Sequence, residues 1–312
     1  MMRKVILTFL FFMVIPMMTA FSQEKTGAAQ SNTLQVFMQP ADYKGSSVPY
    51  GNNPEHGRYA ESEGAKIYFE TYGTGEPLLV LHGGMVGCTY EMGQFIDHLS
   101  KQFQVIAVST RGHGKSEIGH TPVTYEQRAK DALAALNAAA PNKPAIVLGF
   151  SGGAYSAYKL ASMFPDRVKK LVAIGAGENL RLLRVVPRSK VEEVEKIDPA
   201  FMKLQESLMP EPARLQSYWD ELYVFYNDRM IADKKLFNNI KCPTLLISGE
   251  LDTHAPLDTV ISAYKMIPES RLAIIQGAPH QVMVTNFPAV WENIKGFLEL
   301  ANDTKIGQRS SE

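Results

Sequence analysis

The sequence predicts an α/β fold, in which a mostly parallel sheet is flanked by helices and carries one inserted helical segment. Two patterns predict it: short apolar runs recur along the chain, and segments with helical spacing lie between them. A run that is apolar at every position is typical of a strand buried on both faces, as in a parallel sheet. The chain has 312 residues, 45% of them hydrophobic and 21% charged, which is the composition of an ordinary globular protein with one large core.

The charge balance excludes two classes of protein. Lys and Arg together number 32, as do Asp and Glu, so the formal net charge is zero. Proteins that bind nucleic acids or membrane surfaces carry an excess of basic residues, because Lys and Arg supply the affinity for phosphate. We therefore expect no nucleic-acid partner.

The N-terminus has the pattern of a secretory signal peptide over residues 1–22. A basic start with Arg3 and Lys4 precedes the apolar stretch Val5–Met18, and the small residues Ala20 and Ser22 follow it. This stretch is short for a spanning helix and has no basic flank after it, which argues against an uncleaved anchor. Cleavage would remove two of the 32 basic residues and no acid, leaving a formal charge of −2. We expect an exported protein, periplasmic or secreted, with no membrane span after cleavage.

The rest of the chain divides according to its patterns. Residues 23–60 are rich in Gln, Ser, Asn, Gly and Pro and predict an irregular lead-in. The predicted core covers residues 61–177 and 241–302, a predicted helical cap covers residues 178–240, and residues 303–312 form a tail.

The expected strands and helices follow one another along the core. Ala65–Tyr72 alternates as a half-buried strand does, and Gly73–Gly75 turns the chain into the next strand. Six apolar runs predict buried strands: Leu78–Leu81, Val105–Val108, Ala145–Leu148, Leu171–Ile174, Thr244–Ile247 and Leu272–Ile275. Four segments with helical spacing predict helices: Tyr125–Ala140, Ala154–Met163, Leu257–Met266 and Ala289–Leu300.

The segment 178–240 has no strand-like run, and it is far longer than an ordinary connection in an α/β unit. We interpret it as a helical cap inserted between two strands, and a pair of ordinary packing helices is the alternative. Its aromatic and apolar residues fall on two helical faces: Leu215, Trp219, Leu222 and Tyr226 on one, Tyr218 and Phe225 on the other.

A candidate nucleophile lies where a predicted strand turns into a helix. The run Ala145–Leu148 leads into Gly149-Phe150-Ser151-Gly152-Gly153 and then into the helix that begins near Ala154. A G-x-S-x-G turn between strand and helix holds the serine in a strained conformation that exposes its hydroxyl, and the flanking glycines allow neighbouring backbone to approach. This context predicts a nucleophilic Ser151.

A serine hydroxyl needs a base, and the base needs an orienting carboxylate. His280 follows the last predicted strand, at the sheet edge where open α/β folds bind ligands. Asp252 follows the strand Thr244–Ile247 and is the preferred carboxylate, with Glu250 and Glu178 as competitors.

The loop His82-Gly83-Gly84-Met85 follows the strand Leu78–Leu81. One of its amides, together with the amide of Gly152, could donate hydrogen bonds to an oxyanion. Gly84 is the preferred loop donor and Met85 the alternative.

These motifs resemble those of the α/β-hydrolase fold superfamily. The resemblance rests on Leu81-His82-Gly83-Gly84, the run Ser109–Ser116, Gly149–Gly153, and Gly249–Asp252 with Pro256, followed by Pro279-His280, over roughly residues 63 to 300. It implies a catalytic triad of Ser151, His280 and Asp252, a cap at 178–240 and no cofactor. Two features argue against particular subfamilies. The loop His82–Met85 lacks the motifs of Gly-triplet esterases and proline iminopeptidases, and a serine nucleophile argues against epoxide hydrolases and haloalkane dehalogenases.

The expected activity is therefore hydrolysis of a neutral or weakly polar carboxylic ester or lactone, in the manner of esterases and lactonases. A perhydrolase or a carbon–carbon bond hydrolase with the same triad is one alternative. A non-catalytic ligand-binding protein on the same fold is the alternative from another class.

The remaining histidines and cysteines have ordinary interpretations. No Cys/His cluster has the spacing of a metal site, and Cys88 and Cys242 are expected to be independent thiols. Among the other histidines we expect structural roles for His82 and His113, a place at the pocket rim for His254, and surface positions for His56, His98 and His120.

Overall fold

The computed structural model describes residues 34–181, 183 and 185–299, so the predicted signal peptide and the tail lie outside the described residues. Its centre is an eight-stranded sheet with the spatial order β1-β2-β4-β3-β5-β6-β7-β8. The strands are β1 (Gly57–Ser62), β2 (Ala65–Tyr72), β3 (Glu76–Leu81), β4 (Phe103–Val108), β5 (Ala145–Phe150), β6 (Val168–Ile174), β7 (Thr244–Gly249) and β8 (Ser270–Ile275).

The sheet is mostly parallel, as predicted. Strand β2 pairs antiparallel with both β1 and β4, and every other neighbouring pair is parallel. Every residue of β5 and β7 is buried, which agrees with their apolar runs. The expectation of burial on both faces was wrong for β8: three of its residues are half-buried, and Ile274 is 45% exposed. The reason is that β8 forms the edge of the sheet, where β7 is its only neighbouring strand within residues 34–181, 183 and 185–299.

Strand β1 lies partly in the stretch for which the sequence predicted irregular structure. Only Ala60 and Ser62 of its residues are buried, so it carries no apolar run. It pairs with β2 through a two-residue turn in which Glu63 and Gly64 have φ values of 44° and 77°. Two consecutive positive φ values are typical of a tight β-hairpin, and β1 is therefore held by pairing rather than by a hydrophobic pattern.

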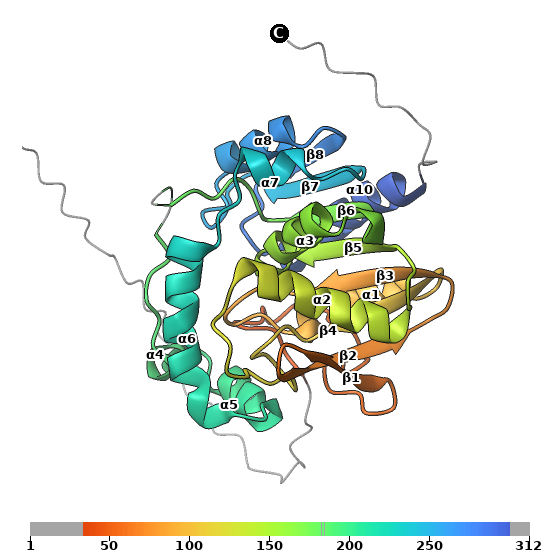
Figure 1. The fold of residues 1–312 in the computed structure, drawn as a ribbon. Coiled ribbons are helices and arrows are strands. Elements are labelled where there is room, and N and C mark those ends of the chain that lie inside the picture. The colour runs from red at the N-terminus through yellow and green to blue at the C-terminus, as the bar shows by residue number, and fades with distance from the viewer. Residues whose placement is uncertain (1–33, 182, 184, 300–312) are drawn as a thin grey trace, which may run out of the picture. The chain divides into compact units, whose positions relative to one another are not determined.

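Helices cover both faces of the sheet (Figure 1). Helices α2 and α3 lie on one face, while α1 and α10 lie on the other, where the Phe95 and Phe287 ring centroids are 5.0 Å apart. The core α-helices are α1 (Gly93–Leu99), α2 (Tyr125–Ala139), α3 (Gly152–Met163), α8 (Leu257–Met266), α9 (Val282–Thr285) and α10 (Phe287–Glu299), and the short 3₁₀ turns are η1 (Thr89–Met92) and η2 (Pro165–Arg167).

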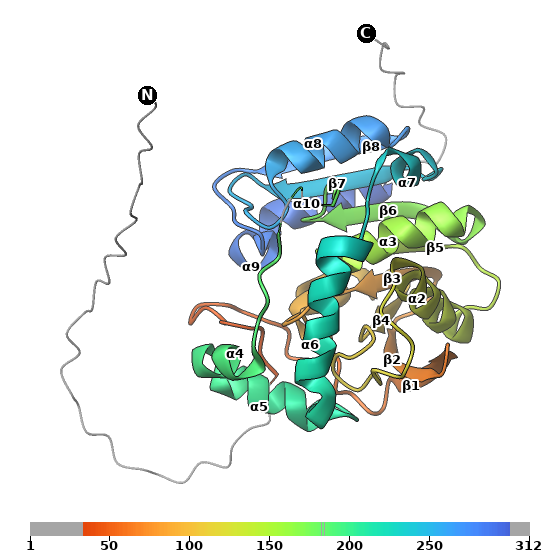
Figure 2. The ribbon, with the colours of Figure 1, turned by 60° about the vertical axis from the view of Figure 1, so that its left-hand side comes forward.

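A helical segment separates β6 from β7, as the sequence predicted. It contains α4 (Val191–Ile197), α5 (Pro199–Leu208), the 3₁₀ turn η3 (Pro212–Arg214), α6 (Leu215–Val224), the π-helical turn η4 (Phe225–Arg229) and α7 (Lys234–Asn238). Asn179 and Ala232 form an antiparallel bridge between its two ends. Figure 2 shows α6 lying across the side of the sheet, with α4 and α5 near one of its ends.

The sequence assigned the aromatic residues of α6 and η4 to two distinct faces, and both of these faces are buried. Trp219 and Tyr226 are 3% and 7% exposed on the first face, and Tyr218 and Phe225 are each 1% exposed on the second. The Tyr218 hydroxyl donates to the carbonyl of Arg111 at 2.6 Å, so this second face packs on the loop after β4.

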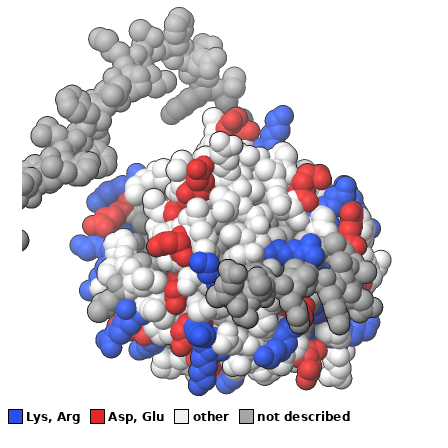
Figure 3. Space-filling model, turned by 90° about the horizontal axis from the view of Figure 1, so that it is seen from above, with Lys and Arg blue, Asp and Glu red and all other residues white. Residues whose placement is uncertain are grey.

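The surface carries charges of both signs (Figure 3), and the two cysteines are independent, as the sequence analysis expected of the cysteines. On the face shown in Figure 3, basic and acidic residues are interspersed, and no visible region carries one sign alone. Cys88 and Cys242 are separate buried thiols. None of the described helices is both long and apolar enough to cross a membrane.

Candidate active site

Ser151 occupies the turn between β5 and α3 in the conformation that the motif predicts. Its φ and ψ are 48° and −116°, a region that residues with a side chain rarely adopt. The turn is tight: a Cβ on Gly149 would lie 2.6 Å from the carbonyl oxygen of Gly153, and a Cβ on Gly153 would overlap the carbonyl of His82. Glycine is therefore required on both sides of the strained serine.

The structure brings the three predicted polar residues into one hydrogen-bonded chain. The Ser151 Oγ lies 2.9 Å from Nε2 of His280, and Nδ1 of His280 lies 2.8 Å from Oδ2 of Asp252. An ionised carboxylate only accepts hydrogen bonds, so Nδ1 carries the hydrogen and Nε2 is free to accept the serine proton. This is the arrangement of a nucleophile, a base and an orienting carboxylate.

Asp252 is held as a carboxylate by its surroundings. Burial alone would raise its pKa, but the hydrogen bond and the charge interaction with His280 outweigh burial and lower the pKa below its usual value. Its other oxygen, Oδ1, accepts the backbone amides of His254 and Ala255, each at 2.8 Å. The amides that follow β7 thereby fix the direction in which the carboxylate faces His280.

The two competing carboxylates have other partners. Glu250 accepts the backbone amide of Gly277 at 2.8 Å, and Glu178 accepts the hydroxyl of Ser262 at 2.7 Å. Among the described residues, only Asp252 makes an ion pair with His280.

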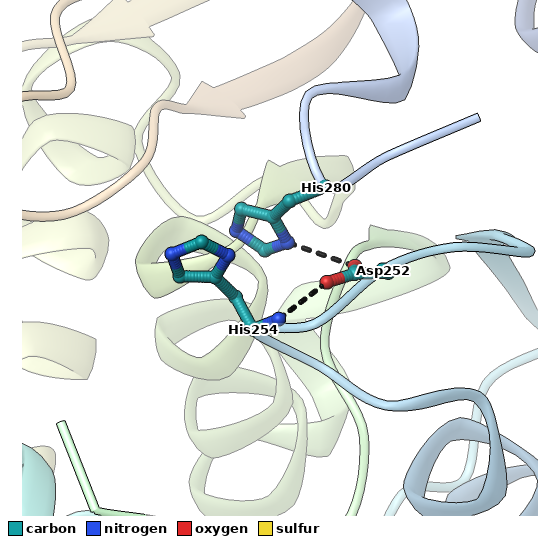
Figure 4. A group of neighbouring side chains, drawn as sticks. All are labelled: Asp252, His254 and His280. Atoms are coloured by element: carbon teal, nitrogen blue, oxygen red, sulfur yellow. Dashed lines mark hydrogen bonds and ion pairs between the residues drawn. The ribbon is translucent and has the colours of Figure 1, made fainter. Parts of the chain in front are cut away.

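His254 lies beside His280 and Asp252 (Figure 4). Its exposed ring stacks on His280, with centroids 4.7 Å apart and planes 27° apart. Ligand atoms of Asp252, His254 and His280 all lie within 4.8 Å of one another, which is close enough to hold a metal ion. However, both Asp252 oxygens and both His280 nitrogens already take part in hydrogen bonds. The donor set therefore fits the hydrogen-bonded chain better than it fits a metal.

The loop after β3 comes next to the nucleophile turn. A Cβ on Gly152 would lie 3.0 Å from the backbone nitrogen of Gly84, the heavy atom nearest to that position. Neither the Gly84 amide nor the Gly152 amide donates a hydrogen bond to any acceptor in the described part of the chain. Of the two loop amides that the sequence left open, Gly84 rather than Met85 is therefore the one beside Gly152.

Buried ionisable groups hold this loop in place. The amide of Gly83 donates to the Glu91 carboxyl at 2.5 Å, and burial raises the pKa of Glu91 to about 8. His82 donates from Nδ1 to the Gly83 carbonyl at 2.7 Å and accepts the Thr110 amide at Nε2. Burial keeps the pKa of His82 well below its usual value and lowers that of His113 to about 4, so both rings are neutral. The structural interpretation of these two histidines is consistent with these contacts.

The sequence analysis did not single out Tyr226 for this site. Its hydroxyl lies beside the Gly84–Gly152 pair, at a position that a Cβ on Gly84 would overlap. Tyr226 belongs to the π-helical turn η4, and such turns occur frequently at functional sites. No sequence signal marks a π turn, so the pattern showed only an apolar face.

Comparison with known proteins agrees with this architecture. The model of the α/β-hydrolase fold matches residues 76–209. A pimeloyl-(acyl-carrier protein) methyl ester esterase of Vibrio campbellii is 26% identical over 258 residues, which cover 74% of this chain and 98% of that protein.

Two solved structures are similar in fold. A meta-cleavage product hydrolase of Pseudomonas fluorescens has a TM-score of 0.68 at 18% identity, covering 79% of this chain and 98% of the other. An enol-lactonase of Burkholderia xenovorans has a TM-score of 0.61 at 21% identity, covering 77% and 99%. The chain thus has the α/β-hydrolase fold, as the motifs predicted.

Proposed function

We propose that this protein is a serine hydrolase that cleaves a carboxylic ester or a lactone through an acyl-enzyme on Ser151. The observation that carries the proposal is the chain from Ser151 Oγ through His280 to Asp252, with hydrogen bonds of 2.9 and 2.8 Å. The strained backbone of Ser151 and the unpaired amides beside it support the same chemistry.

In the proposed reaction, His280 takes the proton of Ser151 through Nε2 as the serine oxygen attacks the substrate carbonyl. The carbonyl electron pair moves onto its oxygen, where the amides of Gly84 and Gly152 donate hydrogen bonds. Asp252 stabilises the imidazolium that forms, and His280 then protonates the leaving alcohol. A water molecule, deprotonated by His280, hydrolyses the acyl-enzyme.

The substrate class is inferred from relatives and from the charge balance. The methyl ester esterase at 26% identity and the enol-lactonase structure support an ester or lactone, and the absence of a basic excess favours a neutral or weakly polar substrate. The similar meta-cleavage product hydrolase favours carbon–carbon bond hydrolysis as a second candidate, since the same triad serves it. A panel of esters of increasing acyl length, lactones and vinylogous 1,5-diketones would separate the two activities by their relative kcat/KM.

Labelling of Ser151 tests the mechanism directly. A fluorophosphonate should modify the wild-type protein with a stoichiometry of one, at Ser151, and should not modify Ser151→Ala. Absence of labelling in folded wild-type protein would refute the proposal. Labelling without turnover of any substrate in the panel would favour the ligand-binding alternative.

We also propose that the protein is exported after cleavage near residue 22. The supporting observation is the basic start, the apolar stretch Val5–Met18 and the small residues that follow. Expression with its own N-terminus in a Gram-negative host should yield a periplasmic or extracellular protein whose N-terminal sequence begins near Gln23. An intact N-terminus on cytosolic protein would contradict this.

A further inference from the structure

The hydroxyl of Tyr226 is a buried polar group that no contact satisfies. The residue is 7% exposed, and its oxygen has no hydrogen-bond partner within the described part of the chain. Leaving such a group unpaired costs about 1–3 kcal/mol, so buried hydroxyls in folded proteins normally have a partner. A buried donor with no partner in the free protein is suited to an acceptor that the ligand brings.

The position of this hydroxyl identifies that acceptor. A Cβ on Gly84 would overlap the Tyr226 oxygen, and a Cβ on Gly152 would lie 3.5 Å from it. This Cβ on Gly152 would also lie 3.0 Å from the backbone nitrogen of Gly84. Three donors without acceptors therefore meet beside Ser151: the amides of Gly84 and Gly152 and the phenol of Tyr226.

The π-helical turn explains how the segment delivers this side chain. The amide of Met230 donates to the carbonyl of Phe225 at 2.8 Å, an i to i+5 hydrogen bond that widens the helix. Phe225 and Tyr226 are both buried, with ring centroids 5.2 Å apart. Phe225 faces the Arg128 guanidinium at 5.2 Å, so it anchors the turn on α2, while Tyr226 points to the nucleophile turn.

The surroundings of Tyr226 favour negative charge. Arg128 is 5% exposed, and it makes no ion pair with any described carboxylate. Its polar contact is with the Tyr218 hydroxyl at 3.1 Å. The charge of Arg128 interacts with Tyr226 as well as with Asp131, so a buried positive charge lies close enough to stabilise an anion that forms nearby.

We propose that Tyr226 is a catalytic residue: its hydroxyl donates a third hydrogen bond to the oxyanion. This inference rests on the proposed function. As the Ser151 oxygen bonds to the carbonyl carbon, the C=O electron pair moves onto the oxygen, and that oxygen accepts from the two amides and from the phenol. The phenol keeps its proton throughout, so proton transfer remains with His280. The helical segment thereby contributes directly to the chemistry as well as covering the site.

Tyr226→Phe tests this, because it removes only the hydroxyl. With p-nitrophenyl butyrate as substrate, kcat should fall about 10- to 1,000-fold while KM stays within about threefold, since the hydrogen bond strengthens only as charge develops. The affinity for an aryl trifluoromethyl ketone, which forms a tetrahedral adduct with an oxyanion, should fall by the same factor as kcat/KM. Fluorophosphonate should still label Ser151 stoichiometrically, but more slowly.

Tyr218→Phe is the matched control, because the hydroxyl of Tyr218 is buried under the same helix but is bonded to Arg111 and Arg128. It should lower the melting temperature and leave kcat within about threefold of wild type. Equal losses in the two variants would overturn the proposal, because loss of any phenol there would then disturb the site.

The remaining outcomes are also distinguishable. An unchanged kcat in Tyr226→Phe would overturn the role of Tyr226 but not the proposed function. An increased kcat would do the same and would also show that the phenol obstructs the site. Failure of fluorophosphonate to label the wild type would overturn the proposed function and this inference together.

Discussion

The α/β core and the inserted helical segment hold their polar groups in opposite ways. In the core, Ser151, His280 and Asp252 are bonded to one another, and Asp252 accepts two further amides. In the inserted segment, the Tyr226 hydroxyl that reaches the same site has no hydrogen-bond partner among the residues that the structure describes. The difference indicates that the core fixes the reacting groups before substrate arrives, whereas the inserted segment presents a donor whose acceptor appears only with the substrate.

The contacts between the two regions support this comparison. Main-chain groups of the core loop bind side chains of the inserted segment: the Ile118 amide donates to Glu211 at 2.6 Å, and the Val123 amide donates to Glu221 at 2.7 Å. The segment is thus anchored away from the triad, along residues 111–123.

The largest change in activity should come from a substitution in the α/β core. Asp252→Asn keeps the shape of the side chain but removes the charge that orients and stabilises His280, so kcat should fall by about 10⁴-fold. Steady-state kinetics with p-nitrophenyl butyrate would measure it.

Glu250→Gln is the control for Asp252→Asn, because Glu250 lies two residues earlier and its carboxylate bonds only the Gly277 amide among the described residues. It should keep kcat within about threefold of wild type. A large loss in Glu250→Gln with a small loss in Asp252→Asn would reverse the assignment of the carboxylate.

A smaller effect, on thermal stability, should come from a substitution where the core and the inserted segment meet. A Cβ on Gly84 would overlap the Tyr226 hydroxyl but would lie 3.0 Å from the ring carbon that bears it. Gly84→Ala should therefore displace the tyrosine side chain. Overpacking of this kind lowers the free energy of unfolding by about 1–3 kcal/mol, so the melting temperature should fall by several degrees. Combination with Tyr226→Phe should recover part of this loss.

The double-mutant cycle measures this coupling between core and inserted segment. Strictly additive changes in unfolding free energy would show that Gly84 and Tyr226 do not touch in solution. Differential scanning calorimetry of the wild type, both single variants and the double variant provides the four values.

The last effect leaves activity aside and concerns the pH dependence of stability within the core. Burial raises the pKa of Glu91 to about 8 in the folded protein, from 4.5 in the unfolded chain. The contribution of this carboxyl is therefore present in full below pH 4.5 and is lost as the pH rises through 8. Glu91→Gln should be stabilised relative to wild type by up to about 1.4 kcal/mol for each pH unit between these values, and by a constant amount above.

Urea unfolding of wild type and Glu91→Gln from pH 5 to pH 9 would measure this difference. The buried neutral histidines His82 and His113 have lowered pKa values, and their contribution is lost as the pH falls. Both proteins contain them, so their effect cancels in the comparison. A difference that does not change with pH would show that Glu91 is ionised in the folded protein throughout.

The sequence was informative wherever local pattern and local chemistry coincide. The strand Ala65–Tyr72 was predicted with the bounds of β2, and the apolar run before Ser151 became the buried strand β5. The strained turn at Ser151 was predictable because the two glycines of G-x-S-x-G allow such a close approach of neighbouring backbone. The strand β1 was missed because it lies at the sheet edge and buries too few residues to produce a pattern.

The sequence by itself determined the α/β fold, the nucleophile turn and the set of residues from which the hydrogen-bonded chain is drawn. These follow from periodicity and from glycine positions, which depend on neighbours along the chain. Only the tertiary structure decided that Asp252 rather than Glu250 faces His280, that Gly84 lies beside Gly152, and that a π turn places the Tyr226 hydroxyl there. The physical reason is that each of these depends on distances of 3 to 4 Å between segments remote in sequence, and packing sets such distances while a one-dimensional pattern does not record them.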